Sequence, residues 1–424
     1  MRIFQRSIFR RFLCLLLLFT VTSLLYVYVV NKRHLSGFRR TRHRITPRNA
    51  TKIDVLTTQL EQEQCLPVQQ ILFLKTHKTG SSTMTNIFFR YGDARNLSFV
   101  LGLGTFLGWP NKFHIIFPLR FFAKQPNILC SHARFNKKPM NWLFPKATSK
   151  YLTILRNPVD NFESVFNFAH LGKAFGLGDK QDSLDKFLEK EIPLNHSRPN
   201  VMTYLARNPM MFDLGLSLEY FQNLSAVNEY IQFLDKEFDL VMIMDYFDES
   251  LVLMKRLLCW KTDDILYVKL NERLDKEKAR RLSNSVQENI KRWNKADVLL
   301  FDHFNKTFWS KVKNEGPAFY EDLADFRQRK EKIKRRCFTD SVRHQRAYHD
   351  KFVKGYSIRK HLRPSTKALC ENLVRMENSF LEYLRSKRTE KLRNTGLGKE
   401  TSIKQETGWG AAKDLQYEPV KTPN

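Results

Sequence analysis

Apolar residues in the middle of this 424-residue chain fall in short, uninterrupted runs. Three such runs, with Thr153 as the one polar residue among them, lie at Ile71–Leu74, Tyr151–Leu155 and Leu240–Met244. Each is followed by a segment in which apolar residues recur with a helical period. Uninterrupted runs of this length are typical of strands buried on both faces. Because these strands alternate with helices, the sequence predicts an α/β fold with a parallel sheet flanked by helices.

Charged residues mark further helices and a polar C-terminal end. The pattern predicts a surface helix at Asp182–Glu191, an amphipathic helix at Asp248–Leu258 and a long charged helix at Glu321–Arg336. The last part of the chain is polar, with scattered Gly, Lys and Glu, a composition that is typical of disorder. We therefore expect a folded domain at residues 69–385 and a disordered tail at residues 386–424.

The N-terminal run Phe12–Val30 is apolar and uncharged, which is about the length of a bilayer-spanning helix. A cleaved signal peptide is the alternative, but no small-residue cleavage pattern follows this run. We expect an uncleaved anchor, preceded by a cytoplasmic tail at residues 1–11 and followed by a basic, polar stem at residues 31–68. More basic residues follow the anchor than precede it, so the positive-inside rule alone argues against a lumenal body.

Glycosylation sequons and cysteines favour a lumenal body instead. The cysteines beyond the anchor are widely spaced, which suits a secretory-pathway domain with one or two disulfides and a leftover thiol. We expect a pair between Cys337 and Cys370. No cysteine has the spacing of a zinc site, so no metal is expected. The Asn-x-Ser/Thr sequons begin at Asn49, Asn96, Asn195, Asn223 and Asn305.

The net charge of +29 indicates a polyanionic partner, an anionic membrane surface or an acidic small ligand. Lysines and arginines cluster at Arg2–Arg48 and again at Arg327–Arg336, with hydrophobic sequence between them. This distribution argues against one continuous nucleic-acid-binding stripe.

The segment after the first strand has the composition of an anion-binding loop. A helix is expected to open at Ser81, so backbone N–H groups and the helix dipole would face one spot, and Lys78 would add a charge. The lysine precedes the glycine, which excludes a nucleotide-triphosphate loop. A simple strand–turn–helix corner is the alternative reading. The candidate ligand-binding residues are Lys78, Thr79, Gly80, Ser81, Ser82 and Thr83.

A second candidate follows the strand at Tyr151–Leu155. Arg156 ends this strand, Pro158 stands near the first helical position and Ser164 follows about two turns later. A guanidinium and a hydroxyl at the same sheet edge as the first loop could hold a second phosphate. An ordinary surface arginine is the alternative.

Together these motifs resemble the donor site of membrane-bound Golgi sulfotransferases, which have a P-loop-like sulfotransferase fold. The likeness extends over roughly residues 69–383 and is closest to the galactose-3-O-sulfotransferase family, which includes galactosylceramide sulfotransferase. The stretches that carry it are Leu74-Lys-Thr-His-Lys-Thr-Gly-Ser-Ser-Thr83, Cys130-Ser-His-Ala-Arg-Phe135, Ile154-Leu-Arg-Asn-Pro158, Phe162-Glu-Ser164, Asp245-Tyr-Phe-Asp-Glu-Ser-Leu-Val-Leu253 and Leu258-Cys-Trp260.

The resemblance implies a type II Golgi membrane protein that uses 3′-phosphoadenylyl sulfate as donor and no metal. The first loop would hold the 5′-phosphosulfate, and Arg156 with Ser164 would hold the 3′-phosphate. The acceptor would be the 3-hydroxyl of a β-galactose on a glycolipid or a glycoprotein glycan. Two positions depart from the pattern: Asn157 stands where many sulfotransferases have Asp, and Gly80 where the family often has Ala.

Sulfuryl transfer needs a cation at the leaving oxygen and a base at the acceptor hydroxyl. Lys78 is the expected cation. His132 is the first candidate for the base, since related uronyl 2-O-sulfotransferases place a catalytic His just before the Arg-Asx-Pro strand. His77 is the second, although it could equally cap the loop from behind, and either histidine could be structural.

The acceptor site is less well defined, because sugars are held by aromatic faces and a few polar groups. Two alternatives to a galactose sulfotransferase remain at this point: a non-catalytic polyanion-binding protein of the secretory pathway, and a Golgi glycosyltransferase. Nucleic acid is not an expected partner. The acceptor-site candidates are Trp109, Phe113, Trp142, Tyr204, Phe212 and Asp213.

Overall fold

The computed structural model describes most of the chain beyond the predicted stem, and the compact unit that carries these elements begins at Leu66. The predicted anchor lies outside the described residues. No described helix is both long and apolar enough to span a bilayer. The described residues are 65–118, 125–178, 182–190, 200–273, 282–346 and 352–394.

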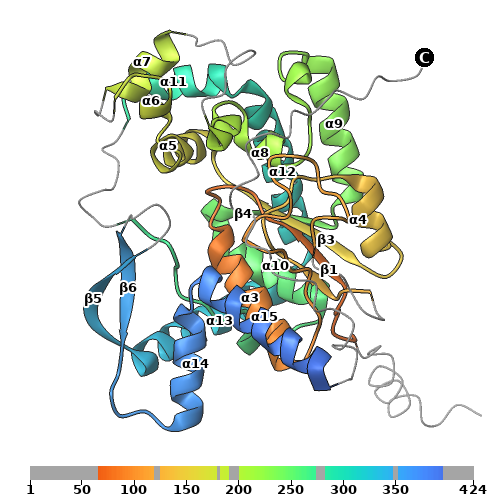
Figure 1. Ribbon diagram of the computed structural model, residues 1–424, viewed down its shortest axis with the longest axis vertical. Helices are drawn as coiled ribbons and strands as arrows, with labels where there is room; N and C mark the ends of the chain where they lie inside the picture. Colours follow the sequence, from red (N-terminus) through yellow and green to blue (C-terminus); the bar gives the residue numbers. More distant parts are fainter. Residues whose placement is uncertain are drawn as a thin grey trace, which may run out of the picture. The chain divides into compact units, whose positions relative to one another are not determined.

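A four-stranded parallel sheet forms the centre of the fold, with strand order β2-β1-β3-β4 (Figure 1). Every residue of β1 and β4 is buried, as are all but the first residue of β3, which explains their continuous apolar runs. The predicted parallel sheet is therefore confirmed. The strands are β1 (Ile71–Leu74), β2 (Ile128–Leu129), β3 (Lys150–Leu155) and β4 (Leu240–Ile243).

Helices surround this sheet (Figure 1). In the first half of the chain they are α3 (Ser81–Ala94), α4 (Lys137–Leu143), α5 (Pro158–Phe168), α6 (Leu171–Ala174), α7 (Ser183–Glu189), α8 (Pro209–Asp213) and α9 (Leu224–Glu237). In the second half they are α10 (Phe247–Leu258), α11 (Asn284–Trp293), α12 (Lys295–Asn314), α13 (Pro317–Cys337), α14 (Pro364–Val374) and α15 (Glu377–Asn394). The three helices predicted from charge patterns correspond to α7, α10 and α13.

The register of the sheet places the two candidate anion motifs together. Leu74, the last residue of β1, pairs with Thr153 of the parallel neighbour β3. The segments that leave these two strands therefore start at the same edge of the sheet, and each leads into a helix, α3 or α5. This is the edge at which open α/β sheets bind ligands.

The C-terminal part of the chain packs back onto the first half. Helix α15 lies beside α3 (Figure 1), and the Phe89 and Phe380 rings are 5.1 Å apart. Because α15 continues to Asn394, the predicted start of a disordered tail at residue 386 is wrong. The polar composition of this segment hides the buried apolar residues of α15, which are Phe380, Leu381 and Leu384.

A disulfide between Cys337 and Cys370 joins the end of α13 to α14, which confirms the predicted pair. The chain between them forms an antiparallel hairpin of β5 (Phe338–Arg346) and β6 (Phe352–Ile358). Cys130 is buried and free.

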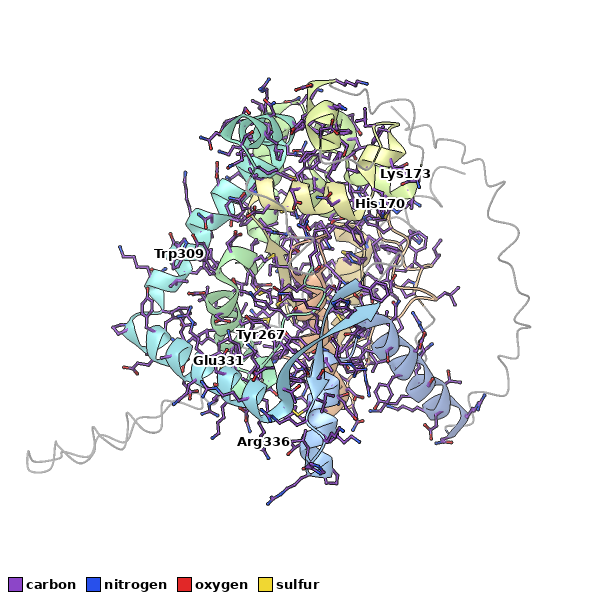
Figure 2. The ribbon with its side chains drawn as sticks, turned by 90° about the vertical axis from the view of Figure 1, so that its left-hand side faces the viewer. His170, Lys173, Tyr267, Trp309, Glu331 and Arg336 are labelled. Atoms are coloured by element: carbon purple, nitrogen blue, oxygen red, sulfur yellow. A yellow bond between two sulfur atoms is a disulfide. The ribbon has the colours of Figure 1, made fainter. Side chains whose placement is uncertain are left out.

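Carboxylates neutralise much of the basic cluster on α13. Asp248 of α10 accepts hydrogen bonds from Lys330 Nζ at 2.6 Å and from the Tyr267 hydroxyl at 2.8 Å, and Figure 2 labels this tyrosine. Arg327 pairs with Glu249 of the same helix at 2.8 Å. These charges therefore join α13 to α10, which gives them a structural role.

Candidate functional site

The loop between β1 and α3 is held in shape by its own hydroxyl groups. Ser81 Oγ donates to the Thr76 carbonyl at 2.7 Å, and the Thr76 and Thr79 hydroxyls are 2.8 Å apart. Lys78 and Gly80 both have left-handed backbone conformations, with φ of 59° and 76°. The turn leads the chain into α3 at Ser81, so the helix N-terminus and the loop amides lie together, which is the arrangement that an anion-binding corner requires.

Arg156 joins the two candidate motifs. Its Nη1 donates to the Lys78 carbonyl at 3.2 Å. Burial lowers the pKa of Arg156 below its usual value, whereas the nearby carboxylates of Asp160 and Asp245 raise it. Asp245 also accepts from the Asn157 amide at 3.0 Å. Other carboxylates therefore supply the negative charge that Asn157 lacks.

Helix α5 carries the remaining predicted donor-site residue. Asn157 caps this helix by accepting from the Val159 amide at 3.0 Å, and Pro158 occupies its first turn. Ser164 is buried within the helix. Lys78 extends from the loop towards the same helix, with Nζ 4.5 Å from the centre of the Phe168 ring.

A segment that the sequence analysis missed crosses the start of α3. Asn271 Nδ2 donates to Ser82 Oγ at 3.0 Å, and the Leu270 amide donates to Thr83 Oγ1 at 3.1 Å. Arg273 pairs with Glu163 of α5, with Nη1 2.9 Å from Oε1. Two of the predicted ligand hydroxyls thus contact this segment, which brings a further arginine near Arg156.

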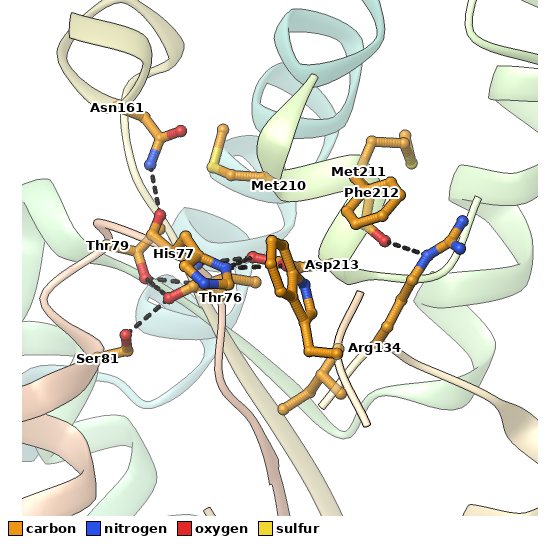
Figure 3. A network of polar contacts seen from close by, with 12 residues as sticks. Thr76, His77, Thr79, Ser81, Arg134, Asn161, Met210, Met211, Phe212 and Asp213 are labelled. Atoms are coloured by element: carbon orange, nitrogen blue, oxygen red, sulfur yellow. Dashed lines mark hydrogen bonds and ion pairs between the residues drawn. The ribbon is translucent and has the colours of Figure 1, made fainter. Parts of the chain in front are cut away.

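His77 is fixed by a buried carboxylate (Figure 3). The His77 amide and ring Nδ1 lie 2.7 and 2.8 Å from Asp213 Oδ2. Trp109 Nε1 donates to the other oxygen of Asp213 at 2.9 Å. Because a carboxylate accepts, Nδ1 carries the proton and Nε2 has the free lone pair. Within the described part of the chain, Nε2 is buried and has no hydrogen-bond partner.

His132 stacks on His77, with ring centres 4.1 Å apart and planes inclined by 20°. Burial lowers the pKa of His132 well below 6.5, and the charges of Lys75 and His77 lower it further. The ring is therefore neutral at neutral pH. One side of the ring is hydrogen-bonded to the Lys75 backbone, and Nδ1 is buried without a partner among the described residues.

Comparison with known proteins identifies the family. The profile of a family described as Galactose-3-O-sulfotransferase matches residues 2–388. The chain belongs to the galactose-3-O-sulfotransferase family. Galactosylceramide sulfotransferase from Mus musculus is 34% identical over 346 residues, which cover 76% of this chain and 79% of the relative. Galactose-3-O-sulfotransferase 2 from Sus scrofa is 32% identical over 347 residues, covering 75% and 84%.

Galactose-3-O-sulfotransferase 3 from Mus musculus is 36% identical over 279 residues, which cover 64% of this chain and 63% of the relative. The resemblance seen in the motifs is thus confirmed, and family membership makes the chain an enzyme. The alternatives of a non-catalytic polyanion-binding protein and a glycosyltransferase find no support.

The segment after β1 contains a second lysine, Lys75, whose role is structural. Lys75 is buried and forms an ion pair with Glu377, the first residue of α15. A buried cation with a carboxylate partner is satisfied inside the protein. Lys75 therefore anchors the loop to the C-terminal helix, and Lys78 is the loop lysine with a partly exposed side chain.

Helix α8, which ends at Asp213, is itself anchored by a second buried carboxylate. Asp297 of α12 accepts from the Met210 and Met211 amides at 3.1 and 2.7 Å. Burial raises the pKa of Asp297 to about 7 although these amides favour its ionised form. The α12 helix thus fixes α8, and α8 fixes His77.

The structure does not bring all of the predicted acceptor-site residues together. Trp109 lies at the histidine pair, 4.7 Å from the His77 ring centre, and Asp213 holds the same histidine. Phe113 and Phe212 belong to the buried core. The two remaining candidates are Trp142, which is exposed on α4, and Tyr204, which stacks on Phe212. Within the described ranges, no group of three His, Cys, Asp or Glu residues could hold a metal ion.

Proposed function

We propose that this enzyme transfers a sulfuryl group from 3′-phosphoadenylyl sulfate to the 3-hydroxyl of a β-galactose residue on a glycolipid or glycoprotein glycan. The observation that carries the proposal is the His77–Asp213 pair at the anion-binding loop. A carboxylate-held imidazole with a free Nε2 is suited to take a proton from a hydroxyl. The loop beside it is suited to hold a phosphosulfate.

The donor binds across the two motifs at the sheet edge. The amides at the start of α3, together with Lys78, Thr79, Gly80, Ser81, Ser82 and Thr83, contact the 5′-phosphosulfate. Arg156 and Ser164 hold the 3′-phosphate. The left-handed turn at Lys78 and Gly80 and the 3.2 Å contact between Arg156 and the loop support this placement.

The reaction follows from these positions. The acceptor oxygen forms a bond to sulfur while the bond from sulfur to the nucleotide's bridging oxygen breaks, releasing 3′,5′-adenosine bisphosphate. His77 Nε2 receives the acceptor proton, and Asp213 stabilises the resulting imidazolium. Lys78 compensates the charge that grows on the leaving oxygen.

The geometry favours His77 over His132 as the base. Among the described residues, both rings offer a buried nitrogen without a hydrogen-bond partner, but only His77 has a carboxylate that stabilises its protonated form. His132 instead faces positive charge from Lys75, which opposes protonation. His132 therefore contacts the acceptor as a neutral group.

An acceptor panel tests this proposal. Purified enzyme is incubated with labelled 3′-phosphoadenylyl sulfate and β-galactosides, including lactose-type glycans and galactosylceramide, and the sulfated position is determined. We expect label on the 3-hydroxyl of galactose. Donor binding without transfer to any galactoside would refute the assignment.

We also propose a type II Golgi membrane location with a lumenal catalytic domain. The uncharged run Phe12–Val30 and the sequons support it. Protease protection in sealed Golgi vesicles, together with a glycosidase-sensitive mass shift, tests this topology. Digestion of the catalytic domain from the cytoplasmic side would contradict it.

A further inference from the structure

An exposed aromatic ring lies against the stacked histidines. Residues 105–107 run beside His132, whose carbonyl accepts from the Leu107 amide at 2.7 Å. This pairing places the Phe106 ring 5.5 Å from His132 and 6.3 Å from His77, centre to centre. Phe106 is 41% exposed, whereas Trp109, whose ring is tilted against that of His77, is 6% exposed. Phe106 is therefore the solvent-facing wall of this site.

The two histidines present a pair of unsatisfied hydrogen-bonding atoms beside that wall. His77 Nε2 and His132 Nδ1 are both buried and lack partners among the described residues. Such atoms are costly to leave unpaired, so a ligand that enters here gains by bonding to both. Two neighbouring hydroxyls on a sugar ring match two adjacent imidazoles.

Access to these atoms requires a side chain to move. Trp109 is buried and tied to Asp213 by its indole N–H at 2.9 Å. Phe106 has an exposed ring on a segment that contains Gly102, Gly104 and Gly108. Phe106 is thus the side chain that can move away from the His77 and His132 rings and pack against an incoming sugar.

We infer that Phe106, His77 and His132 form the acceptor-sugar subsite, and this inference rests on the proposed function. Phe106 packs on the apolar C–H face of galactose, while His77 Nε2 takes the proton of the 3-hydroxyl. His132 Nδ1 accepts a hydrogen bond from the neighbouring 4-hydroxyl. The 4-hydroxyl is the group that distinguishes galactose from glucose, so His132 contributes to acceptor selectivity.

Phe106→Ala and a matched control test the aromatic wall. We expect Phe106→Ala to raise the acceptor KM about three- to tenfold with the donor KM unchanged, because one ring contact is lost. Phe106→Tyr should restore the wild-type value. Leu103→Ala removes another exposed side chain of the same loop, 87% exposed, and should have no effect.

A 4-deoxygalactoside tests the role of His132. Wild-type enzyme should use it less well than the parent galactoside, and His132→Ala should treat the two acceptors alike. Equal acceptor KM in wild type and Phe106→Ala, or equal use of both acceptors by wild type, overturns the subsite. Failure of the proposed function would show differently, because wild type would then sulfate no galactoside at all.

Discussion

His77 and Lys78 are neighbours in the chain, yet their side chains point to opposite sides of the loop. His77 turns towards Asp213 and Trp109, which are buried, and towards the half-buried ring of His132. Lys78, in a left-handed conformation, extends towards α5, and its carbonyl meets Arg156. In the proposed mechanism, this loop therefore separates the base on the acceptor side from the cations on the donor side. Changes on the two sides should alter different kinetic constants.

The largest effect is expected on the acceptor side. Asp213→Asn removes the carboxylate that fixes the His77 tautomer and stabilises its protonated form. We expect kcat to fall by about 10²- to 10⁴-fold, the range of a general base, while 3′,5′-adenosine bisphosphate still binds. Asp263→Asn, at an exposed carboxylate, is the control. A kcat near wild type would refute the pairing.

A substitution on the donor side of the loop should lower the affinity for the nucleotide rather than kcat. Arg156→Ala removes a guanidinium from the expected 3′-phosphate site, and a charged hydrogen bond of this kind corresponds to about 10- to 100-fold in affinity. Calorimetry with 3′,5′-adenosine bisphosphate measures the loss. Arg329→Ala, on the exposed face of α13, is the control. Unchanged nucleotide affinity would remove Arg156 from the donor site.

A substitution of Gly80 tests whether the left-handed turn between the two sides of the loop contributes to stability. Gly80→Ala should lower the free energy of unfolding by about 1–2 kcal/mol, since an L-residue is strained at φ 76°. Steric crowding does not cause this loss of stability, because the added Cβ would lie 3.4 Å from the Met244 and Phe247 side chains, which is an ordinary van der Waals contact. Gly104→Ala, where a Cβ meets nothing within 4 Å, should be nearly neutral in denaturant unfolding. Equal stability of the two variants would contradict this account.

The smallest effect concerns the pH dependence of stability. Burial lowers the pKa of His132 below 6.5, so below that pH the unfolded state binds a proton that the native ring does not. The stability from neutral His132 is present above pH 6.5 and is lost as the pH falls. Relative to His132→Asn, wild type should lose up to about 1.4 kcal/mol more per pH unit in urea unfolding. If the free energies of unfolding of wild type and His132→Asn changed in parallel with pH, His132 would be protonated in the native state.

The local features of the site followed from the sequence. Strand ends, the helix start at Ser81, and the Arg156 and Ser164 positions depend on apolar runs and capping residues that lie close together in the chain. The parallel register then brought Lys78 and Arg156 to one edge. The disulfide between Cys337 and Cys370 is also the expected pair, although cysteine spacing predicted only that one or two disulfides would form.

Partners that come from distant parts of the chain were not predictable. Asp213 was considered only for the acceptor, although it holds His77 across 136 positions. Asn271, Arg273 and Phe106 lie in irregular segments without a periodic pattern or a motif. Tertiary packing alone places them, so no local rule could assign their roles.

Turnover of His77→Ala and His132→Ala, compared at saturating donor and acceptor, tests the central claim most directly. We expect His77→Ala to lower kcat by about 10²- to 10⁴-fold while the enzyme is still stabilised by 3′,5′-adenosine bisphosphate. His132→Ala should retain far more turnover and lose acceptor selectivity. Near-normal turnover of His77→Ala, with abolished turnover of His132→Ala, would contradict the account.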